Sequence, residues 1–255
     1  MSTVTVTATA PISRYVEHVM GMPISLALRG RHHDDAAARG AWAEAMAALR
    51  DVDRVFSTYR ADSHVSRLGR GEIDLDACPP EVAEVLALGE LARQQSHGAF
   101  DVRRGGVLDP SGVVKGWAVE RAARPLRALA ETDFCLSAGG DLVCRTLDPM
   151  TPAWRIGIEN PLATDRLTAV VPVRTGAVAT SGLAHRGAHL VDARSGRTPD
   201  GIASVTVIGP DLTWADIDAT AAFALGAEAA HWLAGRTGRT GLVVWADGRA
   251  ETVTA

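Results

Sequence analysis

The sequence predicts an α+β fold in which helices flank a sheet without alternating strictly with its strands. Apolar helical patterns fill most of the first half, and a run of short segments rich in β-formers fills most of the second. A doubly wound parallel sheet needs regular alternation of strands and helices, so this order favours α+β. At 255 residues, and with no linker or internal repeat, we expect one domain over 1–255, or two lobes sharing a core, with 1–13 as a flexible N-terminus.

The first half is predicted to hold one extended segment and three helices. Residues 14–29 are extended, with a bend at Gly21 and Pro23. A helix over 34–56 follows from apolar positions three or four residues apart, namely Trp42, Met46, Leu49, Val52 and Phe56. A second helix over 80–95 starts at a proline and stops at Gly98. A third, over 115–129, is kinked or shortened at Pro125.

The second half is predicted to be mostly strands, because short runs of β-branched residues are separated by turn formers. The strands are expected at 134–145, 154–159, 167–173, 177–180, 189–191 and 202–208. A helix over 213–233 and a last strand over 241–245 then close the chain.

Composition excludes several classes of protein. The 26 basic and 30 acidic side chains give a formal charge of −4, which disfavours a bulk nucleic-acid binder. Three cysteines without a CxxC pair disfavour a disulfide scaffold or a cysteine-rich zinc site. The first ten residues carry neither a basic start nor a long apolar run, so we expect no secretory signal, no membrane span and a cytoplasmic location.

An acid and an alcohol one helical turn apart, Asp216 and Thr220, form the first candidate site. Residues at i and i+4 share a helix face, and two hard oxygen donors without His or Cys suit Mg²⁺. The alternatives are that Asp216 complements the helix dipole and that Thr220 bonds back to the preceding turn. The choice depends on what else converges on that face.

Four polar, glycine-containing segments lie where the periodic patterns lapse: 56–63, 98–101 with 108–117, 137–141, and 180–182 with 189–196. In the second, Gly112 allows a close backbone approach to a ligand, and Lys115 lies at the expected start of a helix, where anions are favoured. The GxxxxGK[ST] spacing of a Walker loop is absent. The segment therefore suits a phosphate, although such a lysine is ordinarily a solvated charge.

The ordered motifs of the chain resemble the ApbE family, the FAD:protein FMN transferases. They are MGMP near residue 20, FSTYRADS, GAFD, LDPSGVVKGWAVERA, AGGDL, TSG, HLVDARSG and ADIDATAAFALG. Each is weak alone, but together they are specific and cover residues 15–233. The resemblance implies a T-fold-related mixed sheet with flanking helices.

The resemblance also implies roles for individual positions. Asp216, Thr220 and the carbonyl of Gly112 match the family's magnesium ligands, with Mn²⁺ as an alternative metal. His189 matches the family's catalytic histidine, and Lys115 is the second catalytic candidate. The residues expected to contact the flavin nucleotide are Met20, Tyr59, Ala99, Phe100, Asp101, Asp109, Lys115 and Leu190.

The implied reaction splits FAD at its diphosphate and transfers FMN to a Thr or Ser hydroxyl of a cytoplasmic acceptor protein, releasing AMP. His189 is expected to accept the hydroxyl proton, with His185 or a purely structural histidine as alternatives. Asp192 either orients His189 or caps the following turn. Tyr59 either stacks on a flat ring or anchors its loop to the core.

The chain departs from the family pattern in places. The usual DPRTG reads DARSG at 192–196, Leu183 stands where an Asp is frequent, and the loops after Phe100 and Gly182 are short. These departures leave the expected metal face intact and place acceptor recognition in question. Two alternatives therefore remain open: a Mg²⁺-dependent FAD pyrophosphatase and a non-catalytic flavin-binding protein.

Overall fold

An eight-stranded sheet runs through the protein, and the computed structural model describes it over residues 11–184 and 190–254. Along the sheet the strands follow chain order: β1 (Ile12–Val19), β2 (Met22–Gly30), β5 (Thr132–Ala138), β6 (Asp141–Arg145), β9 (Thr175–Gly182), β10 (Ile202–Gly209), β11 (Thr240–Trp245) and β12 (Ala250–Thr254). Each neighbouring pair is antiparallel. The α+β prediction is confirmed, and the sheet is antiparallel where a mixed one was expected.

Tight turns divide two of the predicted strands. The segment over 14–29 is a hairpin whose turn consists of Met20 (φ 56°) and Gly21 (φ 70°). The segment over 134–145 likewise turns at Gly139 and Gly140, which both have positive φ. These left-handed conformations favour glycine, so Gly-Gly marks a turn inside an otherwise continuous apolar run. Strand β1 begins at Ile12, inside the segment over 1–13 that was predicted to be a flexible N-terminus.

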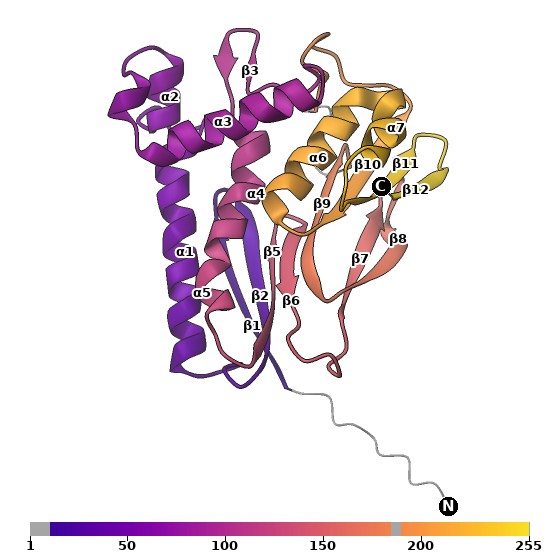
Figure 1. The fold of residues 1–255 in the computed structure, drawn as a ribbon. Coiled ribbons are helices and arrows are strands. Elements are labelled where there is room, and N and C mark those ends of the chain that lie inside the picture. The colour runs from indigo at the N-terminus through magenta and orange to yellow at the C-terminus, as the bar shows by residue number, and fades with distance from the viewer. Residues whose placement is uncertain (1–10, 185–189, 255) are drawn as a thin grey trace, which may run out of the picture.

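Helices cover one face of the sheet (Figure 1). The long ones are α1 (Ala36–Phe56), α3 (Pro80–Gln95), α4 (Ser111–Ala122) and α6 (Leu212–Leu225). The shorter ones are α2 (His64–Gly69), η1 (Leu75–Ala77), α5 (Arg124–Arg127), η2 (Gly226–Glu228) and α7 (Ala229–Ala234). Helices α1, α4 and α6 lie side by side, with α6 against β9 and β10. The predictions for α1 and α3 are confirmed to within two residues.

Two predicted helices have different bounds. The helix expected over 115–129 starts at Ser111 and is divided after Ala122, shortly before Pro125. The helix expected over 213–233 stops at Gly226, whose φ of 59° ends α6 before η2 and α7 begin. Both ends lie at the residues that ordinarily break helices.

The opposite face of the sheet carries a separate hairpin, β7 (Trp154–Asn160) with β8 (Ala163–Val173). Side chains alternate along a strand, so Val143 of β6 faces the helices while Leu142 and Cys144 pack in the smaller cluster with Val173. A two-strand flap, β3 (Arg103–Arg104) with β4 (Val107–Leu108), stands beside α3. The predicted strand at 189–191 is wrong for Leu190 and Val191, which precede an isolated bridge between Asp192 and Arg197.

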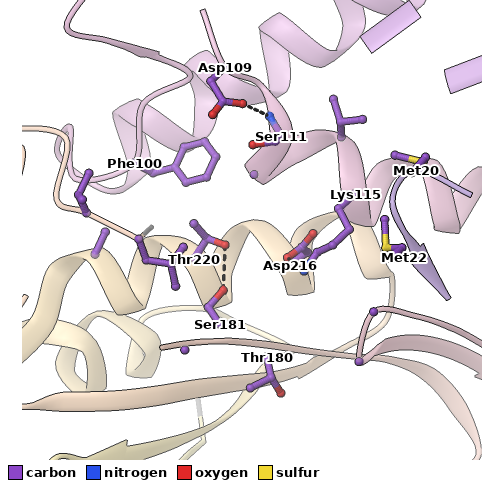
Figure 2. A pocket seen from close by; sticks show the side chains of 18 of the residues that line it. Met20, Met22, Phe100, Asp109, Ser111, Lys115, Thr180, Ser181, Asp216 and Thr220 are labelled. Atoms are coloured by element: carbon purple, nitrogen blue, oxygen red, sulfur yellow. Dashed lines mark hydrogen bonds and ion pairs between the residues drawn. The ribbon is translucent and has the colours of Figure 1, made fainter. Parts of the chain in front are cut away.

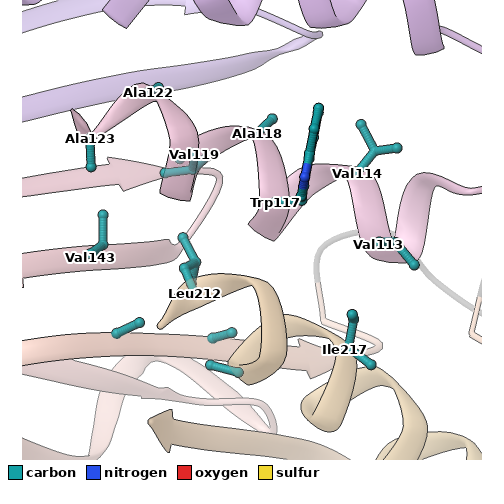
Figure 3. Close-up of a cluster of buried hydrophobic side chains, with 14 of the residues drawn as sticks. Val113, Val114, Trp117, Ala118, Val119, Ala122, Ala123, Val143, Leu212 and Ile217 are labelled. Atoms are coloured by element: carbon teal, nitrogen blue, oxygen red, sulfur yellow. The ribbon is translucent and has the colours of Figure 1, made fainter. Parts of the chain in front are cut away.

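One buried cluster joins the helices to the sheet (Figure 3). Helix α4 contributes Val113, Trp117 and Val119, and α6 contributes Leu212 and Ile217. The two helices therefore meet in the centre of the core, where their polar side chains are fixed by tight packing. Among the described residues, no helix is long and apolar enough to cross a bilayer.

Candidate active site

A cleft of about 1380 Å³ opens where α4, α6 and the ends of the central strands meet. It exceeds the roughly 300–1,000 Å³ typical of small-molecule pockets, which leaves room for a dinucleotide. All of the predicted site residues that the structure describes line this cleft: Met20, Tyr59, Ala99, Phe100, Asp101, Asp109, Gly112, Lys115, Leu190, Asp216 and Thr220. Residues spread over two hundred positions of sequence thus converge, while their individual roles stay predictions.

A glycine sets the distance between the two helices at the floor of the cleft. A Cβ on Gly116 would lie 2.6 Å from the carbonyl oxygen of Leu212 and 2.7 Å from Cβ of Asp216. The backbone N–H of Gly116 donates a 2.9 Å hydrogen bond to Oδ2 of Asp216. The close approach of α4 and α6 therefore also fixes the carboxylate of Asp216.

One lysine is shared by two buried carboxylates. Nζ of Lys115 lies 2.5 Å from Oδ2 of Asp141 and 3.2 Å from Oδ1 of Asp216 (Figure 2 shows Lys115 against Asp216). Both aspartates have side chains only 1% exposed, and Oδ1 of Asp141 also accepts from the backbone N–H of Thr180. When both carboxylates are ionised, the three side chains carry a net charge of −1.

Burial raises the pKa of Asp216 above its ordinary value, and the neighbouring Asp141 raises it further, while Lys115 opposes both effects. The two carboxylates in turn hold the pKa of Lys115 above its ordinary value despite its burial, so its ammonium stays charged. Because one ammonium cannot neutralise two carboxylates, additional positive charge beside Asp216 would be stabilised.

Two hydroxyl groups, of Thr220 and Ser181, lie at the floor of the cleft one helical turn beyond Asp216. Oγ1 of Thr220 lies 2.9 Å from Oγ of Ser181 on β9, as Figure 2 shows. The Phe100 ring and Thr220 both flank Gly112, since a Cβ there would lie 3.0 Å from the ring and 3.8 Å from Cγ2 of Thr220. The first turn of α4 is therefore seated directly against Thr220.

The oxygen donors at this point fit a hard divalent cation. The described residues hold no cluster of three or more His, Cys, Asp or Glu side chains suited to a metal, so an ion here would need hydroxyl and carbonyl oxygens as well. Asp216, Thr220 and the adjacent Gly112 backbone supply that mixture, and the excess negative charge favours a cation. These are the residues expected to bind Mg²⁺ or Mn²⁺, and that assignment stays a prediction.

The predicted flavin contacts that the structure describes all line the same cleft. Phe100 is buried, Met20 is half-buried in its hairpin turn, and Tyr59 is fully exposed at the cleft. Exposure of Tyr59 rules out its alternative as a core anchor. Asp101 and Asp109 accept hydrogen bonds from the backbone N–H groups of Arg103 and Ser111, so both carboxylates are oriented by local turns.

His189 and its alternative His185 lie outside the described residues, so their roles stay predictions. Asp192 is described, and its carboxylate accepts from the backbone N–H and Nε of Arg194. These contacts agree with the turn-capping alternative for Asp192, and its alternative role of orienting His189 stays a prediction.

Sequence reasoning missed two residues of the floor, Asp141 and Ser181. Both lie in motifs that carried the resemblance, AGGDL and TSG, but neither was given a role. An acid directly after a Gly-Gly turn was the available signal for Asp141. Its pairing with Lys115 could not be read from the sequence, because the two residues meet only through packing of α4 on the sheet.

Comparisons with known proteins agree with this arrangement. The sequence profile of the ApbE family matches residues 20–109 and 102–243. The FAD:protein FMN transferase of Salmonella typhimurium is 29% identical over 153 residues, covering 55% of this chain and 43% of that protein. The Haemophilus influenzae protein of the same name is 24% identical and covers 73% of each chain. The match thus spans less than half the length of the Salmonella relative.

Solved structures share the fold. The ApbE protein of Thermotoga maritima superimposes with a TM-score of 0.82 at 19% identity, covering 95% of this chain and 97% of that one. The flavinyl transferase ApbE of Pseudomonas stutzeri gives 0.80 at 22% identity, with 97% of each chain covered. At such identities the likeness establishes the architecture alone.

Proposed function

Because the chain belongs to the ApbE family, we propose that it is a FAD:protein FMN transferase. It would transfer the FMN part of FAD to a Thr or Ser hydroxyl of an acceptor protein and release AMP. The relatives that bear this name supply the reaction class. That the acceptor is a protein of the cytoplasm is part of the proposal.

The supporting observation is the floor of the cleft. A dinucleotide-sized cavity ends on a lysine held by two buried carboxylates with an uncompensated negative charge, next to two hydroxyl groups. Mg²⁺, when bound there by Asp216, Thr220 and the Gly112 carbonyl, would draw negative charge from the diphosphate of FAD. Mn²⁺ offers the same chemistry.

In the proposed reaction the acceptor hydroxyl oxygen forms a bond to the flavin-side phosphorus. The bond from that phosphorus to the bridging oxygen breaks, and the oxygen leaves with AMP. The hydroxyl proton passes to a base, for which His189 remains the predicted residue. Such transfers depend mainly on positioning and on neutralising charge.

We propose that Lys115 binds the phosphate. Its ammonium forms ion pairs with Asp141 and Asp216, and the side chain is 21% exposed at the cleft. In this proposal an N–H group of the ammonium donates to a non-bridging phosphate oxygen. Its two acidic partners keep the ammonium charged and hold it at one point, which a solvated surface lysine would not provide.

The test is to incubate FAD and Mg²⁺ with the protein and a cell extract containing candidate acceptors, and then to measure AMP by chromatography. Wild-type protein should release AMP and leave FMN on a Thr or Ser peptide detectable by mass spectrometry. Asp216→Asn should lower AMP release by at least about a hundredfold, because the anionic ligand is lost. Removing Mg²⁺ with a chelator should have the same effect.

Asp211→Asn is the matched control, since it makes the same substitution on the same helix. Asp211 caps α6 by accepting from the N–H of Trp214, and Asn caps equally well. Release of AMP together with free FMN would contradict transfer and indicate hydrolysis. Absence of AMP would contradict catalysis and indicate flavin binding alone.

A further inference from the structure

The described lining of the cleft is acidic, although the proposed substrate is an anion. The described side chains that line it include five carboxylates and two cations: Asp53, Asp101, Asp109, Glu159 and Asp216, with Arg104 and Lys115. Lys115 is already paired with Asp141 and Asp216. Arg104 forms no ion pair or side-chain hydrogen bond with any other described residue. It is therefore the uncommitted cation of the described cleft lining.

Arg104 lies on the flap formed by β3 and β4. Arg104 pairs with Val107, and Gly105 (φ 57°) and Gly106 (φ 80°) make the two-residue turn between them. Positive φ at both central positions matches the twist of a two-residue hairpin, so the glycines are needed for this tight turn. Arg104, Gly105 and Val107 all line the cleft.

Buried residues fix the base of the flap. Val102 packs against Gly89 of α3, where a Cβ would lie 2.7 Å from Cγ1 of Val102. Leu108 is buried beside Gly69 of α2. The N–H of Asp109 donates a 2.8 Å hydrogen bond to the carbonyl of Val102, which closes the hairpin. The two ends of the flap are thus held by packing and by a hydrogen bond, and the short hairpin projects from them.

The flap leads directly into the anion-favouring end of α4. Asp109 follows β4, and α4 begins two residues later at Ser111, where the helix dipole favours negative charge. Neighbouring residues of a strand point to opposite faces, so Arg103 and Arg104 diverge. Of the two, only Arg104 lines the described cleft.

We propose that Arg104 binds a phosphate oxygen of the FAD diphosphate from the flap, in the same cleft as Lys115 and Asp216. This inference rests on the proposed function, which places a diphosphate in the cleft. An arginine fork suits phosphate oxygens better than a lysine point charge does. The flap would therefore select flavin dinucleotide over uncharged flavin.

The test measures binding rather than turnover, by following flavin fluorescence during titration with protein. FAD and riboflavin, which has no phosphate, are the two probes. Arg104→Gln should weaken FAD binding by about tenfold or more, as expected for one charge-assisted hydrogen bond, and leave riboflavin binding unchanged. Arg103→Gln is the matched control and should change neither affinity.

Three results would overturn the inference. Unchanged FAD affinity in Arg104→Gln would show that the guanidinium makes no phosphate contact. Equal losses in Arg103→Gln and Arg104→Gln would indicate a diffuse effect of charge. A parallel loss of riboflavin would point to a contact with the ring. Wild-type protein that binds FAD without releasing AMP contradicts the proposed function alone, whereas wild-type protein that binds no FAD contradicts both.

Discussion

At Lys115, a single ammonium group meets two buried carboxylates from distant parts of the chain. Burying three charged groups costs desolvation energy, and a site with an unbalanced carboxylate is poorly suited to stabilising the fold. The unbalanced carboxylate of this cluster would therefore stabilise a bound cation. Its position at the floor of the cleft links it to anion chemistry.

The close approach of α4 and α6 at Gly116 predicts that one added methyl group destabilises the protein. Gly116→Ala places a methyl group 2.6 Å from a backbone oxygen of α6, so the helices must separate. We expect a loss of about 1–3 kcal/mol in the free energy of unfolding, as for overpacked cores, measured by urea denaturation. AMP release should also fall, because Asp216 moves with α6.

Gly40→Ala is the control for this change. Gly40 lies within α1, is exposed, and has nothing within 4 Å of its Cβ position. Alanine should stabilise that helix by about 0.5–1 kcal/mol. Equal effects of the two substitutions would contradict the crossing argument.

Residue-scale features that depend on short spacing could be predicted from the sequence. Asp216 and Thr220 lie one helical turn apart, and both line the cleft as expected. The pairing of Asp141 with Lys115 could not be predicted, because it depends on how far α4 lies from the sheet. The sequence could equally not predict that Arg104 has no acidic partner among the described residues, since this depends on which carboxylates lie within its reach in the folded chain.

At the scale of elements, turn chemistry explains most differences between prediction and structure. Gly-Gly at 139–140 and Met-Gly at 20–21 made hairpins from apparent single strands, because residues of positive φ reverse the chain without interrupting the apolar pattern. The flap and α2 were not predicted, since elements this short bury too few residues to produce a periodic signal. The long helices were predictable because their apolar stripes repeat over many turns.

Helix α6 carries one aspartate at the cleft, Asp216, and another in buried ion pairs, Asp218. Asp216 faces the cleft, while the buried Asp218 pairs with Arg236 at 2.8 Å and Arg239 at 3.0 Å. Removing one partner of a buried ion pair leaves uncompensated charge. Asp218→Ala should therefore lower the free energy of unfolding by about 3 kcal/mol in urea denaturation, with FAD affinity retained in the folded protein.

Glu44→Ala on the exposed face of α1 is the control and should change stability by less than about 0.5 kcal/mol. Loss of FAD affinity in folded Asp218→Ala would show that the two faces of α6 are not independent.

At the scale of the whole molecule, the chain repeats one order of elements. Strands β1 and β2, a helical segment containing α4, and strands β5 and β6 are followed by β9 and β10, α6, and β11 and β12. No internal repeat is visible in the sequence, since arrangements of elements can agree where side chains do not. The floor of the cleft lies between the halves, because Lys115 comes from one and Asp216 from the other.

The single-domain prediction can be tested by measuring whether the whole chain unfolds in one cooperative transition. One buried cluster contains α1 and α4 from the first half and α6 and β10 from the second, so neither half keeps its core when the other unfolds. Urea unfolding followed by far-UV circular dichroism and by tryptophan fluorescence should give one coincident transition, although chains of this length often populate intermediates. The fluorescence reports on both halves, through Trp42 and Trp117 in the first and Trp214 and Trp232 in the second. Two separated transitions would show that the halves are independent domains and that the cleft is an interface between them.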